Sequence, residues 1–128
     1  MITKKKVYLC ENCGNALESV WDGKGIVQCC GKLIMELKSK TTGADKEIHT
    51  PVIKRDGSKV TVSVGEEPHP MLSDDHCIVF IEVLAGDKVL RHDFKKGDKK
   101  AEALFFVEEG VPIKARAFCN LDDLWESN

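Results

Sequence analysis

The sequence predicts an all-β protein in which a small cysteine-rich module precedes an antiparallel β-sandwich. Four of the six cysteines lie within the first thirty residues, short apolar segments then recur roughly every 8–12 residues, and no window shows a helical hydrophobic period. The 128 residues suffice for one ordinary domain plus a module held by a metal. We expect a metal domain at 1–38, a polar linker at 39–46 and the sandwich at 47–128.

Two pairs of cysteines define the N-terminal module. Cys10 and Cys13 are separated by two residues, so both thiolates can reach one ion, and Gly14 permits the turn behind them. Cys29 and Cys30 are adjacent, and both can reach the same ion only if the backbone bends sharply. We expect a closed four-sulfur iron site, with zinc in the same site or a vicinal disulfide as the alternatives.

The sandwich is predicted from five short strands. Residues 59–64 alternate strictly, with Val60, Val62 and Val64 on one face, and they follow a turn at Asp56-Gly57. Residues 77–84 are almost continuously apolar, as in a strand buried on both faces. We place the remaining strands at 77–84, 88–94, 102–107 and 113–119.

Composition and charge narrow the classes of function. The formal net charge is -2 and the charges are mixed along the chain, so a basic footprint for nucleic acid or for a membrane surface is absent. No apolar run approaches the roughly 20 residues that span a bilayer, and no signal stretch follows the N-terminus. We therefore expect a cytoplasmic protein, in which clustered cysteines indicate metal binding and not disulfides.

Motifs spread over the whole chain, in order, resemble the desulfoferrodoxin family. The Cys-x-x-Cys and vicinal Cys-Cys pattern is similar to desulforedoxin and to the first domain of that family. Residues 47–52 resemble its Glu-Lys-His-x-Pro-Val segment, and 69–71 resemble its His-Pro-Met. His76 stands where the family has a histidine that opens a strand, and residues 119–125 resemble its Cys-Asn-x-His-Gly-x-Trp ending.

The resemblance implies an immunoglobulin-like sandwich and superoxide reductase activity, the one-electron reduction of superoxide to hydrogen peroxide at non-haem ferrous iron. It implies two irons per chain, one in the four-cysteine site and one held by imidazoles and an axial thiolate with one position open. The implied ligands of the second iron are His49, His69, His76 and Cys119, and Glu47 is the implied gate. An electron donor such as rubredoxin and a homodimer are the implied partners.

Two positions depart from the family pattern. Ile48 replaces a lysine that would attract superoxide, so we expect a slower and less salt-sensitive encounter unless Lys46 or Lys54 substitutes. Asp122 replaces the fourth histidine and is a candidate ligand of the second iron, with a solvent-facing side chain as the alternative. As a ligand, its carboxylate would turn a cationic ferrous centre into a neutral one.

Two further functions remain open from the sequence. One is a non-catalytic iron protein for electron transfer or redox sensing, in which the altered second site no longer reacts. The other is a structural zinc-binding module on an adhesive sandwich. Of the residues outside the motifs, His92 is interpreted as a surface side chain and Cys77 as a buried small hydrophobe.

Overall fold

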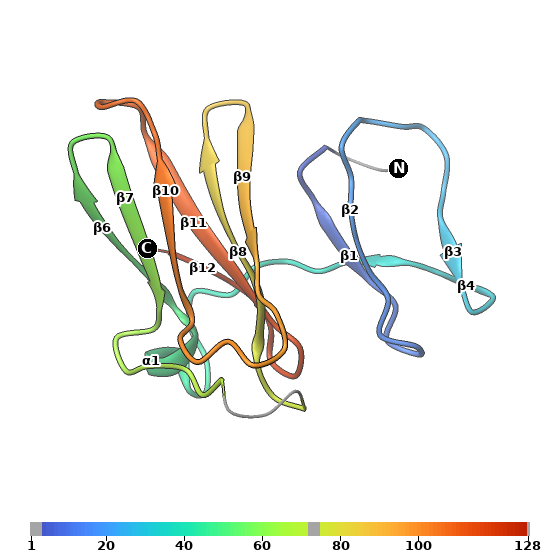
Figure 1. Cartoon of the computed structure of the whole chain (residues 1–128). Helices are drawn as coiled ribbons and strands as arrows, with labels where there is room; N and C mark the ends of the chain where they lie inside the picture. Colours follow the sequence, from blue (N-terminus) through green and yellow to red (C-terminus); the bar gives the residue numbers. More distant parts are fainter. Residues whose placement is uncertain (1–3, 72–74, 128) are drawn as a thin grey trace. The chain divides into compact units, whose positions relative to one another are not determined.

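The computed structural model describes residues 4–71 and 75–127 and divides into two compact units, residues 1–38 and 39–128 (Figure 1). Both units are built from antiparallel strands, and the described residues contain a single helical turn. Within these same ranges, no helix is long and apolar enough to cross a membrane. The all-β fold class predicted from the sequence is confirmed.

The first unit is a pair of small antiparallel sheets with very little core. Its five strands are β1 (Val7–Leu9), β2 (Ala16–Glu18), β3 (Gln28–Cys29), β4 (Lys32–Leu33) and β5 (Met35–Glu36). The strand order is β2-β1-β5 in one sheet, and β3 pairs with β4 in the other. The buried apolar residues of its described part are Val7, Tyr8 and Cys10, whereas Trp21 is 76% exposed. Hydrophobic burial therefore contributes little to the stability of this unit.

A tight hairpin turn explains how adjacent cysteines can serve one site. Cys30 and Gly31 connect β3 to β4 and both have positive φ, 54° and 74°. Positive φ at both central residues is typical of the two-residue type I′ turn, which reverses the chain within two residues. The turn therefore supplies the sharp bend that the vicinal pair requires.

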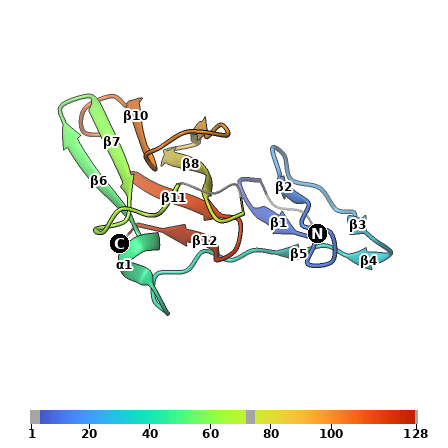
Figure 2. The same cartoon turned by 60° about the horizontal axis from the view of Figure 1, so that its bottom comes forward.

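The second unit is a β-sandwich of two antiparallel sheets. Its elements are α1 (Lys46–His49), β6 (Pro51–Asp56), β7 (Lys59–Val64), β8 (Ile78–Ala85), β9 (Lys88–Asp93), β10 (Glu102–Phe106), β11 (Ile113–Cys119) and β12 (Asp123–Glu126). One sheet has the order β10-β7-β6 and the other β12-β11-β8-β9. Figure 2 shows β6 and β7 side by side, with β11 and β12 in the neighbouring layer. In Figure 1, α1 lies at the lower end of the sandwich, where the β11–β12 turn also lies.

The core lies between the two sheets. Val60 and Val62 of β7 and Ile81 and Val83 of β8 have essentially no exposed surface, and the small residues of β11 complete the layer. Burying each such aliphatic side chain contributes about 1.5–3 kcal/mol. Alternate residues of β11 face this core, and Cys119 is the last of them. The predicted metal ligand Cys119 is therefore held directly by the core of the sandwich.

The middle of β8 is buried on both faces, as its nearly continuous apolar sequence predicts, although Val79 near its start is 36% exposed. Its outer face carries Glu82, whose Oε1 accepts a hydrogen bond at 2.6 Å from Nε of Arg116 on β11. Beside this pair, Phe80 stacks on Phe118 with ring centroids 5.6 Å apart. Both contacts join residues directly opposite each other in the β8–β11 register, so they fix that register from the outside.

The five strands predicted from the sequence are all present, with ends that differ by no more than one residue. Within the second unit, strands β6 and β12 and the turn α1 were not predicted, and no strand was predicted for the first unit, which contains β1–β5. Strand β6 ends on three consecutive exposed charged residues, Lys54 to Asp56, because it is an edge strand, and β12 has only four residues. The four residues of α1 are too few to show a period.

Candidate metal centres

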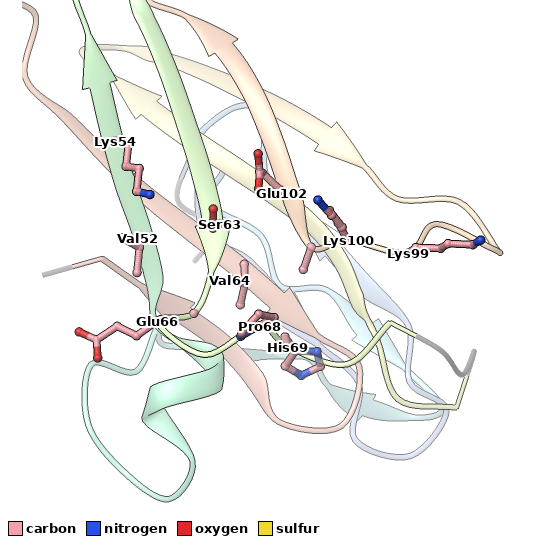
Figure 3. A pocket seen from close by; sticks show the side chains of 12 residues that line it. Val52, Lys54, Ser63, Val64, Glu66, Pro68, His69, Lys99, Lys100 and Glu102 are labelled. Atoms are coloured by element: carbon pink, nitrogen blue, oxygen red, sulfur yellow. The ribbon is translucent and has the colours of Figure 1, made fainter.

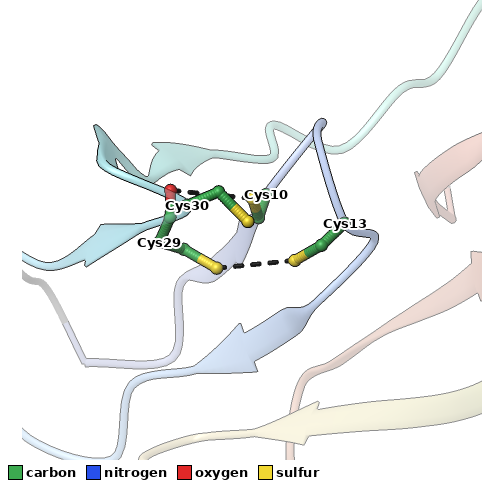
Figure 4. A group of neighbouring side chains, drawn as sticks. All are labelled: Cys10, Cys13, Cys29 and Cys30. Atoms are coloured by element: carbon green, nitrogen blue, oxygen red, sulfur yellow. Dashed lines mark hydrogen bonds between the residues drawn. The ribbon is translucent and has the colours of Figure 1, made fainter.

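The four cysteines of the first unit converge on one point (Figure 4). Their sulfur atoms all lie within 4.8 Å of one another, and the Sγ atoms of Cys13 and Cys29 are 3.5 Å apart. A tetrahedral metal with bonds of about 2.3 Å separates its sulfurs by about 3.8 Å. All six cysteines are free thiols, so the alternative of a Cys29–Cys30 disulfide is wrong for this structure. The donor set fits iron or zinc.

Local hydrogen bonds shift the pKa values of two of the four thiols in opposite directions. The backbone N–H of Cys13 is the main reason why the pKa of Cys10 falls to about 7. Hydrogen bonds with the thiols of Cys10 and Cys13 raise the pKa of Cys29 to about 12. Cys10 therefore ionises before Cys29, whose thiol is hydrogen-bonded to its neighbours. A bound cation would replace the thiol protons, so metal binding here releases protons.

Four side chains from distant parts of the second unit form the other group. His49 ends α1, His69 lies in the loop after β7, His76 precedes β8, and Cys119 ends β11. Their nearest donor atoms lie within 4.8 Å of one another. His49, His69 and Cys119 are at most 3% exposed, and His76 is partly exposed. Three imidazoles and a thiolate are donors that suit iron.

Backbone carbonyls fix two of the three rings. Nδ1 of His49 donates to the carbonyl of Asp45 at 2.8 Å, and Nδ1 of His69 donates to the carbonyl of Pro70 at 2.8 Å. A carbonyl only accepts, so Nδ1 carries the hydrogen and Nε2 of the neutral ring keeps its lone pair. The two Nε2 atoms lie 3.2 Å apart. Burial lowers the pKa of His69, which keeps that ring neutral and able to bind a metal.

A close backbone approach holds α1, and with it His49, against the end of β7. A Cβ added to Gly65 would lie only 2.5 Å from the carbonyl oxygen of Glu47. The backbone N–H of Glu67 donates to the same oxygen at 3.1 Å, and that of His69 donates to Val64 at 2.9 Å. The absence of a side chain at Gly65 therefore allows both histidine segments to pack at one place.

Cys119 and Asp122 meet across the β11–β12 turn. Their Sγ and Oδ2 atoms are 3.6 Å apart, and Cys119 has no exposed surface. Burial raises the pKa of the Cys119 thiol to about 11. Burial would also raise the pKa of Asp122, but the nearby His49 and the hydrogen bonds from Cys119 and His76 outweigh it, so this pKa lies below its ordinary value. A buried thiol beside a carboxylate keeps its proton until a cation displaces it.

Asn120 holds the third histidine in place, a role that the sequence analysis did not assign. Its Oδ1 accepts from the backbone N–H of Cys77 at 2.9 Å, and its Nδ2 donates to the carbonyl of Asp75 at 3.0 Å. These bonds tie the segment around His76 to the β11–β12 turn. Nε2 of His76 then lies 3.0 Å from Oδ2 of Asp122. A lone asparagine after the cysteine gives little signal for such a clamp.

Trp125 forms one wall of the group. Its ring stacks on His49 with centroids 5.2 Å apart and an angle of 17° between the planes. Its Nε1 donates to the carbonyl of Asp122 at 2.7 Å, and the ammonium of Lys40 lies 5.6 Å from its ring centroid. Trp125 is 2% exposed. It therefore orients one imidazole and excludes water from that side.

The other sequence candidates lie outside the donor group. Glu47 is exposed on α1 and lines a cavity of about 310 Å³ that includes none of the four donor residues. Ile48 beside it is half-buried. His92 lies on β9 against Phe94, with ring centroids 4.8 Å apart, so it does not supply a fourth imidazole. Cys77 is half-buried and packs against the core.

A cavity of about 320 Å³ reaches His69 from the side of the sandwich (Figure 3). Three lysines line it, namely Lys54, Lys99 and Lys100, together with two glutamates. Figure 3 shows His69 at one end and Lys54 and Lys100 along the walls. The cavity thus carries a local excess of positive charge next to a buried imidazole.

Comparison with known proteins gives a consistent result. The desulfoferrodoxin family model matches residues 40–128. The chain is 44% identical to a desulfoferrodoxin homologue of Archaeoglobus fulgidus over 123 residues, which cover 95% of each chain. It is 42% identical to a desulfoferrodoxin of Syntrophotalea carbinolica, with 99% of this chain and 98% of that one covered.

Solved structures agree with the fold. The superoxide reductase of Treponema pallidum superposes with a TM-score of 0.75 over 96% of both chains, and at 21% identity this likeness concerns the fold alone. The one-iron superoxide reductase of Giardia intestinalis is 28% identical, with a TM-score of 0.54 over 64% of this chain and 96% of that one. With the family model matching most of the chain and the relatives matching nearly all of it, the protein belongs to the desulfoferrodoxin family.

Proposed function

We propose that this protein is a superoxide reductase that converts superoxide, one electron and two protons to hydrogen peroxide. The observation that carries the proposal is the convergence of three imidazoles and one thiolate within 4.8 Å in a chain of this family. Iron bound there would supply the electron. The protein's own task is to hold the donor atoms, limit the access of water and guide an anion to the open side.

His49, His69, His76 and Cys119 are the proposed iron ligands. Their positions need little rearrangement, because two of the rings are already oriented by carbonyls and the sulfur is fixed at the end of a core strand. Cys119 is fully buried, and a sulfur that is not hydrated gives more of its electron density to a metal. A strong thiolate donor stabilises the oxidised iron and so makes the reduced iron a better electron donor.

The other iron of the pair has four proposed ligands in the first unit, namely Cys10, Cys13, Cys29 and Cys30. Four sulfurs close the coordination sphere, so this centre can pass electrons but has no position for a substrate. We assign to it the relay of electrons from a rubredoxin-like donor, and we expect the protein to act as a homodimer. Zinc in this site would leave it purely structural.

We assign the guidance of superoxide to charged residues around the second centre. Lys54, Lys99 and Lys100 line the cavity that reaches His69, and their positive charge attracts an anion in place of the family lysine that Ile48 replaces. Glu47 lies on the exposed side of α1, two residues before His49, and we assign its carboxylate the role of a gate. Neither role involves a group that binds the iron.

The test is the reaction of the reduced, iron-loaded protein with a pulse of superoxide. We expect superoxide to oxidise the second centre and to yield one hydrogen peroxide for each superoxide without release of oxygen, which separates a reductase from a dismutase. Cys119→Ser should abolish this reaction. Cys77→Ser, a change of the same kind next to His76, should keep it. If superoxide leaves the ferrous centre unoxidised, the proposed function is wrong.

A further inference from the structure

We propose that Asp122 is a fifth ligand of the iron bound by the histidine–cysteine group, and that its Oδ2 occupies the fourth corner of a square whose other corners are the three imidazoles. This inference rests on the proposed function, because it concerns the same iron. It adds a carboxylate to a donor set of imidazoles and one thiolate, and it therefore assigns the centre a different charge.

Distances between the donor atoms place Asp122 at that corner. Its Oδ2 lies 3.1 Å from Nε2 of His49 and 3.0 Å from Nε2 of His76, and Nε2 of His49 lies 3.2 Å from that of His69. Two ligands at right angles on bonds of about 2.1 Å are about 3.0 Å apart. All three separations are close to this value, so each pair fits neighbouring positions around one ion.

Ring positions give the order around the square. The ring centroids of His49 and His76 are 6.3 Å apart, whereas the centroid of His69 lies 4.8 Å from each of them. His49 and His76 are therefore opposite corners, with His69 between them on one side. Asp122, in contact with both His49 and His76, lies between them on the other side.

Cys119 lies beside this square and not in it. Its Sγ is 3.5 Å from Nε2 of His69 and 3.6 Å from Oδ2 of Asp122, which are the two opposite corners. Because the three imidazoles and Asp122 fill the four corners of the proposed square, the Cys119 thiolate would reach the same ion from outside that square.

A conflict of lone pairs indicates that a cation belongs between these groups. Nδ1 of His49 uses its hydrogen on the carbonyl of Asp45, so the Nε2 of the neutral ring faces Oδ2 of Asp122 with a lone pair at 3.1 Å. Two acceptors at this distance repel each other unless a proton on Nε2 or a metal ion lies between them, and a metal ion can bind both atoms at once. Asp122 is 42% exposed, yet its Oδ2 lies within 3.1 Å of Nε2 of both His49 and His76. An iron ion between the two atoms would remove this repulsion. A carboxylate that had no metal to bind could avoid it by turning toward the solvent.

The carboxylate changes the charge of the centre. Ferrous iron with one thiolate and neutral imidazoles alone carries a positive charge, and the carboxylate makes it neutral. A negative ligand stabilises ferric over ferrous iron, so Asp122 lowers the reduction potential of the centre. It also weakens the attraction of the centre for superoxide, which leaves long-range attraction to the lysines around the cavity.

The experiment compares Asp122→Asn and Asp122→Ala with the matched control Asp123→Asn. Asp123 is the next residue, has a half-exposed carboxylate paired with Lys40 at 3.2 Å, and has φ 69°, which asparagine tolerates. The control removes the same charge from the same turn. Ferrous iron affinity is measured by competition with a chelator, and the reduction potential is read from the thiolate-to-iron absorption of the second centre, separately from the four-sulfur centre.

We expect both Asp122 variants to bind ferrous iron at least ~10-fold more weakly than the wild type. Their reduction potential should rise by ~59 mV for each tenfold by which ferric binding weakens more than ferrous binding. Asp123→Asn should change neither quantity by as much as half of this. If the Asp122 variants match the control while keeping the wild-type circular dichroism spectrum, Asp122 is not a ligand and only this inference fails. If the wild-type protein itself holds no iron at His69 and Cys119, the proposed function fails together with the inference.

Discussion

At the scale of single residues, the second centre depends on which atom of each ring is left free. Backbone carbonyls of Asp45 and Pro70 take the Nδ1 hydrogens of His49 and His69, so the Nε2 lone pairs face one another. The arrangement is costly without a cation and favourable with one. Metal binding is therefore prepared by hydrogen bonds in the shell around the donor residues.

Asn120 is the side chain with the clearest positioning role. Asn120→Ala removes the two bonds that tie Asp75 and Cys77 to the β11–β12 turn, so His76 should become mobile. We expect the affinity of the second centre for ferrous iron to fall about 10–100-fold. The stability should fall by about 1–3 kcal/mol. Chelator competition and denaturant titration measure the two effects.

Leu121→Ala in the same turn provides the control for this change, because Leu121 is 62% exposed. It should leave iron affinity within the error of the wild-type value. Equal iron affinity in the Asn120 variant and the wild type would contradict the positioning role, whereas equal losses in both variants would indicate a general weakening of the turn.

At the scale of elements, two short turns bring the donors together. The Cys30–Gly31 turn reverses the chain between β3 and β4, and the β11–β12 turn returns Asp122 to Cys119. Strand β12 is therefore the support of one side of the second site, since it carries Trp125 as well. Its attachment to β11 and to residue 39 depends partly on one carboxylate, that of Glu126.

Glu126→Gln should reveal the contribution of this carboxylate as a change in how the free energy of unfolding depends on pH. The hydrogen bond from Lys114 and then that from Ser39 lower the pKa of Glu126 below its ordinary value. A lowered carboxyl pKa stabilises the folded state above the ordinary pKa, and this contribution is lost as the pH falls through the folded value. We expect the variant to be less stable by about 1 kcal/mol at pH 7 and to match the wild type in strong acid.

Denaturant titrations across the acid range measure this difference, with Glu109→Gln as the control on an exposed turn. The control should run parallel to the wild type at every pH. A Glu126 variant that is destabilised by the same amount in acid as at neutral pH would show that packing, and not charge, accounts for the loss.

At the scale of the whole molecule, the two units are stabilised by different means. The sandwich has a continuous apolar core between its sheets, whereas the described part of the first unit buries three apolar residues, Val7, Tyr8 and Cys10. A small unit with so little core depends on its metal for folding. The centres should therefore respond differently to metal removal.

Cys13→Ser, or treatment with a strong chelator, should unfold the first unit and leave the sandwich folded. Limited proteolysis should then cut within residues 1–38 and release a stable fragment that begins near residue 39. After Cys13→Ser, the second centre should still be oxidised by superoxide. Cys77→Ser is the matched control and should keep both units resistant. A first unit that resists proteolysis without its metal would contradict this view of its stability.

Much of the architecture follows from local sequence patterns. The alternation in 59–64 and the apolar run in 77–84 place the core strands β7 and β8, because side-chain period and burial are local properties. Strands β6 and β12 escaped prediction because their stability comes from pairing with a neighbour and not from a pattern of their own. The roles of the individual site residues, including Glu47 and Asp122, stay predictions.

The sequence by itself determined the all-β class, the family and two groups of metal-binding residue types, because spacing and motif order are written in the chain. Only the tertiary structure decided how His49, His69, His76 and Cys119 surround one point, and that Asp122 turns an oxygen toward them. His49, the segment with His69 and His76, and the segment with Cys119 and Asp122 are far apart along the chain, and their meeting depends on sheet register, a close approach at Gly65 and bonds to backbone carbonyls. Such contacts belong to no local pattern, so a single sequence cannot display them.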